Sequence, residues 1–248
     1  MLVLLSPTKT MKQKTYRGKV SVPVFSDQTM KIADEFKKMS IDQLCQWYNA
    51  SEAIGQQSYL NWQKFHSLPK TVALYAYQGE AFRNFNASTL TKSEITKVNR
   101  HLRILSALYG LLRPLDQINM YRLDLSKNFP KIGNGVDFWR DVVTDQLIED
   151  ILTFKHKIVI NCSSNEYTEM IDIVKLKEIA CWIQVNFEYV KNGQRVNISM
   201  LSKAARGTLA RELSLKPVTS IVQMNRYLSD YVCEIDKKQG IVTYIKHI

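Results

Sequence analysis

Apolar residues along this chain recur with two different spacings, which together predict a mixture of strands and helices. Residues 1–5 form an unbroken apolar run closed by Ser6 and Pro7, which is typical of a buried strand. Two further runs of this kind lie at residues 71–75 and 157–161. Apolar positions follow the spacing of an amphipathic helix in residues 26–66, 93–105, 136–154 and 200–213.

Two hairpins are predicted in the last third of the chain. Asn192 and Gly193 separate two β-rich segments, and this dipeptide favours a tight turn. The segments 231–235 and 240–246 suggest a second hairpin. Strands and helices are mixed without regular alternation, and no linker or internal repeat interrupts them. We therefore expect residues 1–248 to form a single compact mixed α/β domain, and not a regular doubly wound sheet.

Length and composition exclude several classes of protein. A chain of 248 residues with 45% hydrophobic residues can bury a core without disulfides or a structural metal. The four cysteines form no CxxC pair and there are only four histidines, so no metal or cofactor is predicted. The apolar run at the start is too short for an export signal, and no run approaches the ~20 residues that span a bilayer. We expect a cytoplasmic protein without membrane association.

The charge balance points to an anionic partner. Lys and Arg number 34 against 23 Asp and Glu, which gives a net charge of +11. Residues 92–122 carry six basic and only two acidic residues, spread along a predicted helical stretch. A basic surface attracts nucleic acid, acidic lipid or phosphorylated metabolites, although a merely solvated surface is the alternative.

The stretch HLRILSALYGLLRPLD, residues 101–116, suggests how a nucleic acid could be held. Lys97, Arg100 and Arg103 lie three residues apart and would share one side of a helix. Gly110 can adopt the left-handed conformation that ends a helix, and a restarted helix would expose N–H groups to phosphate. This is the logic of a helix–hairpin–helix element over residues 95–116. The alternative is a plain helical corner with Arg113 in a structural ion pair.

Four other segments place polar side chains at strand or helix ends, where ligands of α/β proteins lie. They are LLSPTKT (4–10), YQGEAF (77–82), NCSSNEY (161–167) and SKAARGTLAR (202–211). The candidates for binding phosphate are Ser6, Lys9, Thr10, Ser164, Lys203 and Arg206, and those for catalysis are Glu80, Glu166 and Lys203. Gly207, inside a predicted helix, indicates a close backbone approach. Each segment also has a structural alternative, as a capped loop or a solvated charge.

These segments, together with YRLDL (121–125) and FW (138–139), resemble the YaaA family of bacterial peroxide-stress proteins over nearly the whole chain. The resemblance implies an unusual α/β fold with a helix–hairpin–helix element and a basic cleft. It also implies a cytosolic protein that binds DNA and lowers free intracellular iron. It adds Tyr109, Gly110 and Arg113 to the expected DNA-binding residues and Arg122 to those of the cleft.

Two hypotheses of function follow. The first is a DNA-binding protein of the peroxide stress response that contacts mainly the backbone, with low sequence specificity. The second is an enzyme acting on a phosphate-containing substrate, either a nucleotide or damaged DNA. Its cleft would be built from Ser6, Lys9, Glu80, Glu166, Lys203 and Arg206. The sequence predicts neither a specific reaction nor an oligomeric state.

Overall fold

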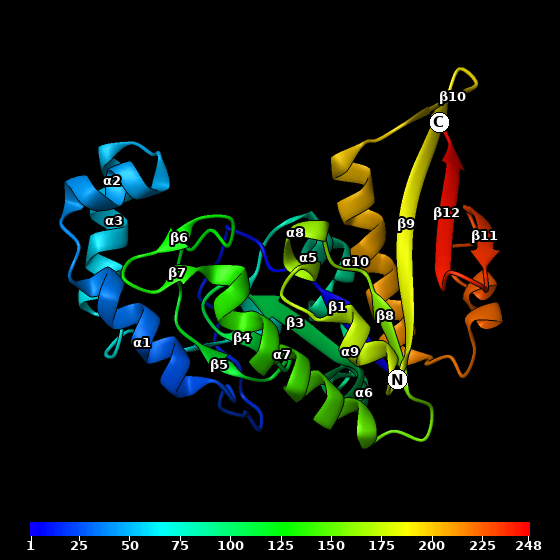
Figure 1. The fold of residues 1–248 in the computed structure, drawn as a ribbon, viewed down its shortest axis with the longest axis horizontal. Helices are drawn as coiled ribbons and strands as arrows, with labels where there is room; N and C mark the ends of the chain where they lie inside the picture. The colour runs from blue at the N-terminus through cyan, green and yellow to red at the C-terminus, as the bar shows by residue number, and fades with distance from the viewer.

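A mixed β-sheet crosses the centre of the molecule (Figure 1). The structure is a computed structural model that describes residues 1–248. In spatial order the strands are β11 (Val232–Asp236), β12 (Ile241–His247), β9 (Cys181–Lys191), β8 (Ile158–Asn161), β1 (Leu2–Leu5), β3 (Leu102–Ser106) and β4 (Gly110–Leu112). An eighth strand, β10 (Gln194–Val196), pairs with the far end of β9.

The five central strands run parallel, and the strands β4, β10 and β11 are antiparallel to their neighbours. Every residue of β1, β3 and β8 is buried. This is the pattern of parallel strands that are covered on both faces, and it explains why β1 and the first three residues of β8 are continuously apolar. The predictions of strands at residues 1–5 and 157–161 are confirmed.

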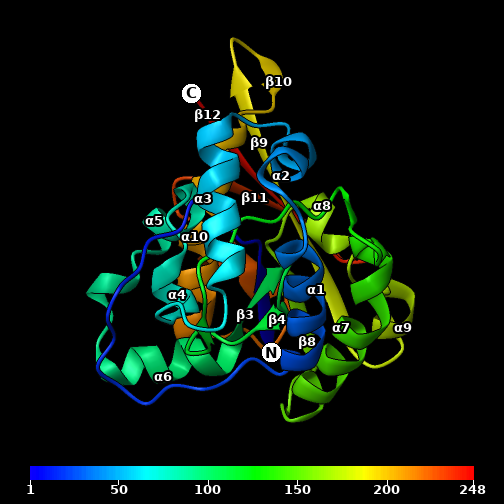
Figure 2. The same cartoon turned by 90° about the vertical axis from the view of Figure 1, so that its left-hand side faces the viewer.

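Helices cover both faces of the sheet, as Figure 2 shows. On one face α10 (Ser199–Leu215) packs against β1, α5 (Glu80–Phe85) and α6 (Lys92–His101). On the other face α7 (Gly135–Leu152) contacts β4 and α9 (Ile173–Lys177), which in turn packs against β9. The helices predicted at residues 136–154 and 200–213 are confirmed, and the molecule is the single mixed α/β domain that was expected.

Three further helices lie at the end of the molecule opposite β11 and β12 (Figure 1). They are α1 (Ser26–Lys37), α2 (Ile41–Tyr48) and α3 (Glu52–Gln63), so the helical prediction for residues 26–66 is confirmed. The ring of Phe36 joins them, because it stacks on Trp62 at 5.0 Å and meets Trp47 edge-on at 4.9 Å. Nearby, the short strands β6 (Asn128–Phe129) and β7 (Gly133–Asn134) add Phe129 to this cluster.

Short elements complete the fold. Strand β2 (Thr71–Val72) pairs with β5 (Gln117–Ile118) and leads directly into α4 (Ala73–Ala76). The strand predicted at residues 71–75 is therefore only two residues long. The remaining elements are α8 (Asn165–Thr168) and the 3₁₀ helices η1 (Ala87–Thr89) and η2 (Ile221–Arg226).

Both predicted hairpins are confirmed. Asn192 and Gly193 connect β9 to β10, and both have positive φ, +52° and +76°. Positive φ at both central residues is what a two-residue turn of this kind requires. The second hairpin joins β11 to β12.

The helix–hairpin–helix prediction for residues 95–116 is wrong. Helix α6 ends at His101, and the chain then forms the antiparallel pair β3–β4, with Ile104 opposite Leu112. Gly110 has the predicted positive φ, +65°, but it begins β4 and does not end a helix. The error has a physical cause, because a strand that is buried on both faces shows no alternation of apolar and polar residues to reveal its period.

Candidate functional site

A cavity of about 450 Å³ lies at the carboxyl ends of β1 and β8. These two parallel strands are neighbours, but the chain leaves them in opposite directions. After β1 it returns to the sheet as β3 on one side, and after β8 it returns as β9 on the other side. Such a switch point leaves a crevice beyond the strand ends, where open α/β sheets bind ligands.

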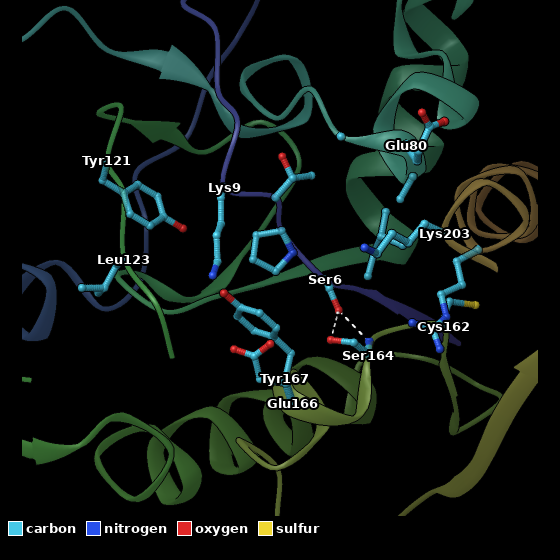
Figure 3. Close-up of a pocket in the computed structure, with 16 residues that line it drawn as sticks. Ser6, Lys9, Glu80, Tyr121, Leu123, Cys162, Ser164, Glu166, Tyr167 and Lys203 are labelled. Carbon is cyan, nitrogen blue, oxygen red and sulfur yellow. Dashed lines mark hydrogen bonds between the residues drawn. The ribbon is translucent and has the colours of Figure 1, made fainter. Parts of the chain in front are cut away.

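Most of the residues predicted for a cleft meet in this cavity (Figure 3). Those that line it are Ser6, Lys9, Glu80, Ser164, Glu166, Lys203 and Arg206. They come from segments as distant in sequence as residues 6 and 206, so only the fold brings them together. Thr10 and Arg122 do not line the cavity. Arg122 lines a neighbouring hollow beside α3, with its guanidinium 5.9 Å from the Tyr48 ring.

The two strand ends are tied together by hydrogen bonds. The Ser164 N–H donates to Ser6 Oγ at 2.7 Å, and the two hydroxyl oxygens are 3.2 Å apart. Asn161, at the end of β8, shapes the following loop because its side chain accepts from the Ser163 N–H at 3.0 Å and donates to Gln184 at 2.9 Å. The serine hydroxyls are therefore held in place on rigid elements.

One wall of the cavity is cationic. Lys203 and Arg206 are one turn apart on α10, and neither is within ion-pair distance of a carboxylate. The Nε atom of Arg206 is buried and has no hydrogen-bond partner. Burial lowers the pKa of this guanidinium below its usual value. No protein group therefore accepts a hydrogen bond from this donor of the cationic wall.

The neighbouring wall depends on a glycine. A Cβ added at Gly207 would lie 1.9 Å from the carbonyl oxygen of Ala81, so α10 and α5 touch backbone to backbone. The predicted close approach is confirmed, and it brings Gly79, Glu80 and Ala81 to the cavity edge. Glu80 itself forms an ion pair with Arg83 on the same helix.

The wall opposite the cations combines a carboxylate with phenol rings. Burial, followed by the nearby charge of Asp124, raises the pKa of the Glu166 carboxyl. Lys9 reaches into the cavity from the loop after β1, and its Nζ donates to Asp124 Oδ2 at 2.6 Å in an ion pair. Burial also raises the pKa of Tyr167 well above its usual value, so this phenol stays protonated. A carboxyl with a raised pKa can act as a general acid or base.

The residues predicted for DNA binding are divided by the structure. Arg103, Tyr109 and Gly110 are buried. Arg103 Nε donates to Asp150 Oδ2 at 2.5 Å, and Tyr109 Oη accepts from the Asn119 N–H at 2.8 Å. Burial therefore removes these three residues from any surface that DNA could reach.

Lys97, Arg100 and Arg113 remain exposed. Arg113 is 3.6 Å from Asp150, which agrees with the alternative of a structural ion pair.

A basic segment that the sequence reasoning missed runs beside α6. Residues 12–19 read KQKTYRGK, and all four of their basic side chains are exposed: Lys12, Lys14, Arg17 and Lys19. The chain continues past Leu115, whose carbonyl accepts from the Ser21 N–H, and Leu115 N–H donates to Asn99 of α6. The segment begins against α4, where the Lys12 N–H donates to the Ala76 carbonyl and the Tyr16 ring stacks on Tyr75, and the chain then passes along α6 (Figure 2). Four basic residues among eight, without an acidic one, were the signal that could have revealed it.

The helices α2 and α3, joined by residues 49–51, pack against each other. They contain no lysine or arginine. We therefore expect an anion-binding surface along α6 and residues 12–19.

No helix is both long and apolar enough to cross a bilayer, and no cluster of three or more His, Cys, Asp or Glu side chains is placed to hold a metal ion.

Comparisons with known proteins agree on one family. A family described as "Peroxide stress protein YaaA" matches residues 1–234. A UPF0246 protein of Legionella pneumophila (strain Philadelphia 1) is 32% identical over 239 residues, covering 92% of this chain and 91% of the relative. A UPF0246 protein of Francisella philomiragia is 30% identical over 240 residues, with 93% and 94% covered. Another, of Shewanella sediminis, is 31% identical over 247 residues, with 95% of each chain covered.

Proposed function

This chain belongs to the peroxide stress protein YaaA family, and from this premise we propose that it is a cytoplasmic DNA-binding protein of the peroxide stress response. In the cell it would limit peroxide damage and the level of free iron. The observation that supports DNA binding is the basic surface formed by residues 12–19 and α6. We call this the α6 surface.

The α6 surface suits phosphate contacts and offers little for reading bases. Its exposed cations are flexible lysines and arginines on one helix and one extended segment: Lys12, Lys14, Arg17, Lys19, Lys92, Lys97 and Arg100. Such contacts position a protein on the backbone without specifying sequence. If four to six phosphates are neutralised, the logarithm of the binding constant should fall against the logarithm of salt concentration with a slope of about −4 to −5.

The test is a salt-dependent titration of the whole chain with duplex, single-stranded and nicked DNA. Lys97→Glu and Arg17→Glu should each weaken binding to every sequence and reduce the salt slope by about 1 or more. Lys191→Glu is the matched control, because it makes the same charge change on the β9–β10 hairpin, at the opposite end of the molecule from α6 in both views (Figure 1). Absence of DNA binding at low salt would refute the proposal. Equal weakening of binding by Lys191→Glu would refute the assignment of DNA binding to the α6 surface.

A second candidate function is favoured by the cavity. The residues expected to act on a phosphate-containing substrate, a nucleotide or damaged DNA, meet around it although they are far apart in sequence. In this function Lys203 and Arg206 bind the phosphate, and Glu166 transfers a proton. Lys203→Ala and Glu166→Ala should then leave DNA affinity nearly unchanged while abolishing turnover. A loss of DNA affinity equal to that of Lys97→Glu would instead assign the cavity to DNA binding alone.

A further inference from the structure

The strongest unexplained feature of the cavity is the guanidinium of Arg206. Its Nε donor is buried without an acceptor, whereas nearly all buried donors in folded proteins have one. No carboxylate balances its charge, and the groups that its field reaches are the Cys162 thiol and the Tyr189 phenol, both neutral. A bound anion on this wall would supply the acceptor and the charge together.

Hydroxyl donors lie beside this cation. Lys203 points toward Ser6 in Figure 3, and Ser6 is hydrogen-bonded to Ser164. Ser6 Oγ accepts from the Ser164 N–H, and the bond between the two hydroxyls uses only one of their two protons, so the other proton is available for a ligand oxygen. Two cations and a fixed hydroxyl that line one cavity can together bind a phosphate monoester, because its several oxygens each accept hydrogen bonds.

The other end of the cavity favours a flat ring. Tyr121 and Leu123 line it, with Tyr167 beside Glu166. The Tyr121 hydroxyl bonds to Ser106 at 2.7 Å and to Tyr77 at 3.0 Å, so these bonds fix the residue where it lines the cavity. Phenol rings stack on nucleobases of any kind, and the Glu166 carboxyl can accept from a base N–H.

Size and continuity point to a ligand larger than phosphate alone. The volume of about 450 Å³ is within the range of roughly 300–1,000 Å³ that is typical of sites for small organic ligands. A second hollow shares Ser164, Glu166, Lys203 and Arg206 with the cavity and continues outward past Arg195. A ligand held at the shared cations could therefore extend in either direction.

We infer that the cavity binds a nucleoside monophosphate unit, with its phosphate at Lys203, Arg206 and Ser6 and its base between Tyr121, Tyr167 and Glu166. The unit is either a free nucleotide or a nucleotide at the end of a DNA strand, whose next phosphates would follow the second hollow. The inference rests on the second candidate function and specifies its ligand. It is independent of DNA binding at the α6 surface.

The test is calorimetric titration of the full chain with each of the four nucleoside monophosphates, the matching nucleosides and inorganic phosphate. At least one nucleoside monophosphate should bind ten-fold or more tightly than both phosphate and its nucleoside. Equal binding of phosphate and nucleotide would overturn the nucleotide assignment while leaving a phosphate site. Absence of binding by all of them at millimolar concentration would overturn both.

Variants separate the two ends of the site. Arg206→Met should lower the affinity for nucleotide and for phosphate by ten-fold or more, with the melting temperature showing that the variant is folded. Tyr167→Leu should lower only the affinity for nucleotide, and Lys191→Met should change neither. A nucleotide affinity unchanged by both Arg206→Met and Lys203→Ala would refute the site.

Short DNA single strands with and without a 5′-phosphate then show whether the bound nucleotide is free or lies at the end of a strand. Tighter binding of a phosphorylated strand than of its mononucleotide supports a strand end, and the reverse supports a free nucleotide. A strand that binds equally with and without its terminal phosphate is held elsewhere, which would refute the strand-end form of the proposal.

Discussion

Replacing Gly207 by alanine should damage both the fold and the candidate site. The added Cβ would lie 1.9 Å from the carbonyl oxygen of Ala81 and 2.6 Å from its carbonyl carbon, whereas such carbon–oxygen contacts are normally about 3.3–3.6 Å. Helix α5 would have to move by about 1.5 Å, because the obstacle is backbone and cannot rotate away. Overpacking costs about 1–3 kcal/mol, and the better helix propensity of alanine returns up to about 1 kcal/mol.

We therefore expect Gly207→Ala to lower the free energy of unfolding by about 2 kcal/mol. In a chain of this size that corresponds to a fall in melting temperature of about 4–8 °C. Differential scanning calorimetry measures it, and ligand titration reports the displaced cavity wall. The matched control is Gly55→Ala in the middle of α3, where the nearest atom is the Cys45 Sγ, which can rotate aside. A Gly207→Ala protein as stable as the wild type would refute the argument.

Three further predictions follow from buried or partly buried groups. Arg103→Met should lower the free energy of unfolding, measured by thermal unfolding, by about 3–5 kcal/mol, because Asp150 loses its close partner. Adding Asp150→Leu should restore most of this stability. An equal loss of stability in the double variant would refute the pairing. Burial raises the pKa of the Cys162 thiol to about 12, so hydrogen peroxide should oxidise the exposed Cys181 before Cys162, as peptide mass spectrometry would show. Equal oxidation in the folded protein would contradict this. The pKa of Glu166 is raised in the folded state, so its ionisation weakens the fold as pH rises above about 4.3, the usual value of this side chain. The melting temperature of Glu166→Gln minus that of the wild type should therefore increase between about pH 4 and 7. A difference that stays constant over this range would contradict the raised pKa.

Local sequence was sufficient where a single physical requirement determines the structure. The turn at Asn192 and Gly193 needs two positive φ angles, and few other residue pairs provide them easily. Gly207 was recognisable because a glycine inside a helix costs stability and so indicates a close neighbour. In both cases the residue type itself records the constraint, and no knowledge of the tertiary structure was needed.

The prediction for residues 102–112 was wrong for the opposite reason. Leu102, Ile104 and Leu105 are completely buried in a strand that is covered on both faces, so its apolar residues do not alternate with polar ones and the strand period cannot be seen. The buried Arg103 strengthened the error, because a charge in sequence is normally read as a surface position. Its partner Asp150 is 47 residues away on α7, and nothing local indicates that the two meet.

The cavity shows a third situation, in which residue types were predicted correctly but their meeting place depended on topology. Ser6 and Ser164 each follow a buried strand, and the sequence identifies both strand ends. That the two strands are neighbours is decided by the order β8-β1-β3, in which the chain visits opposite sides of β1. Once that order is known, the crevice follows, and α10 can bring Lys203 and Arg206 to it only because Gly207 lets the helix touch α5. The glycine inside α10 and the arginine beside it, which has no ion-pair partner, therefore belong to one arrangement, in which stability is given up to place a cation at the strand ends.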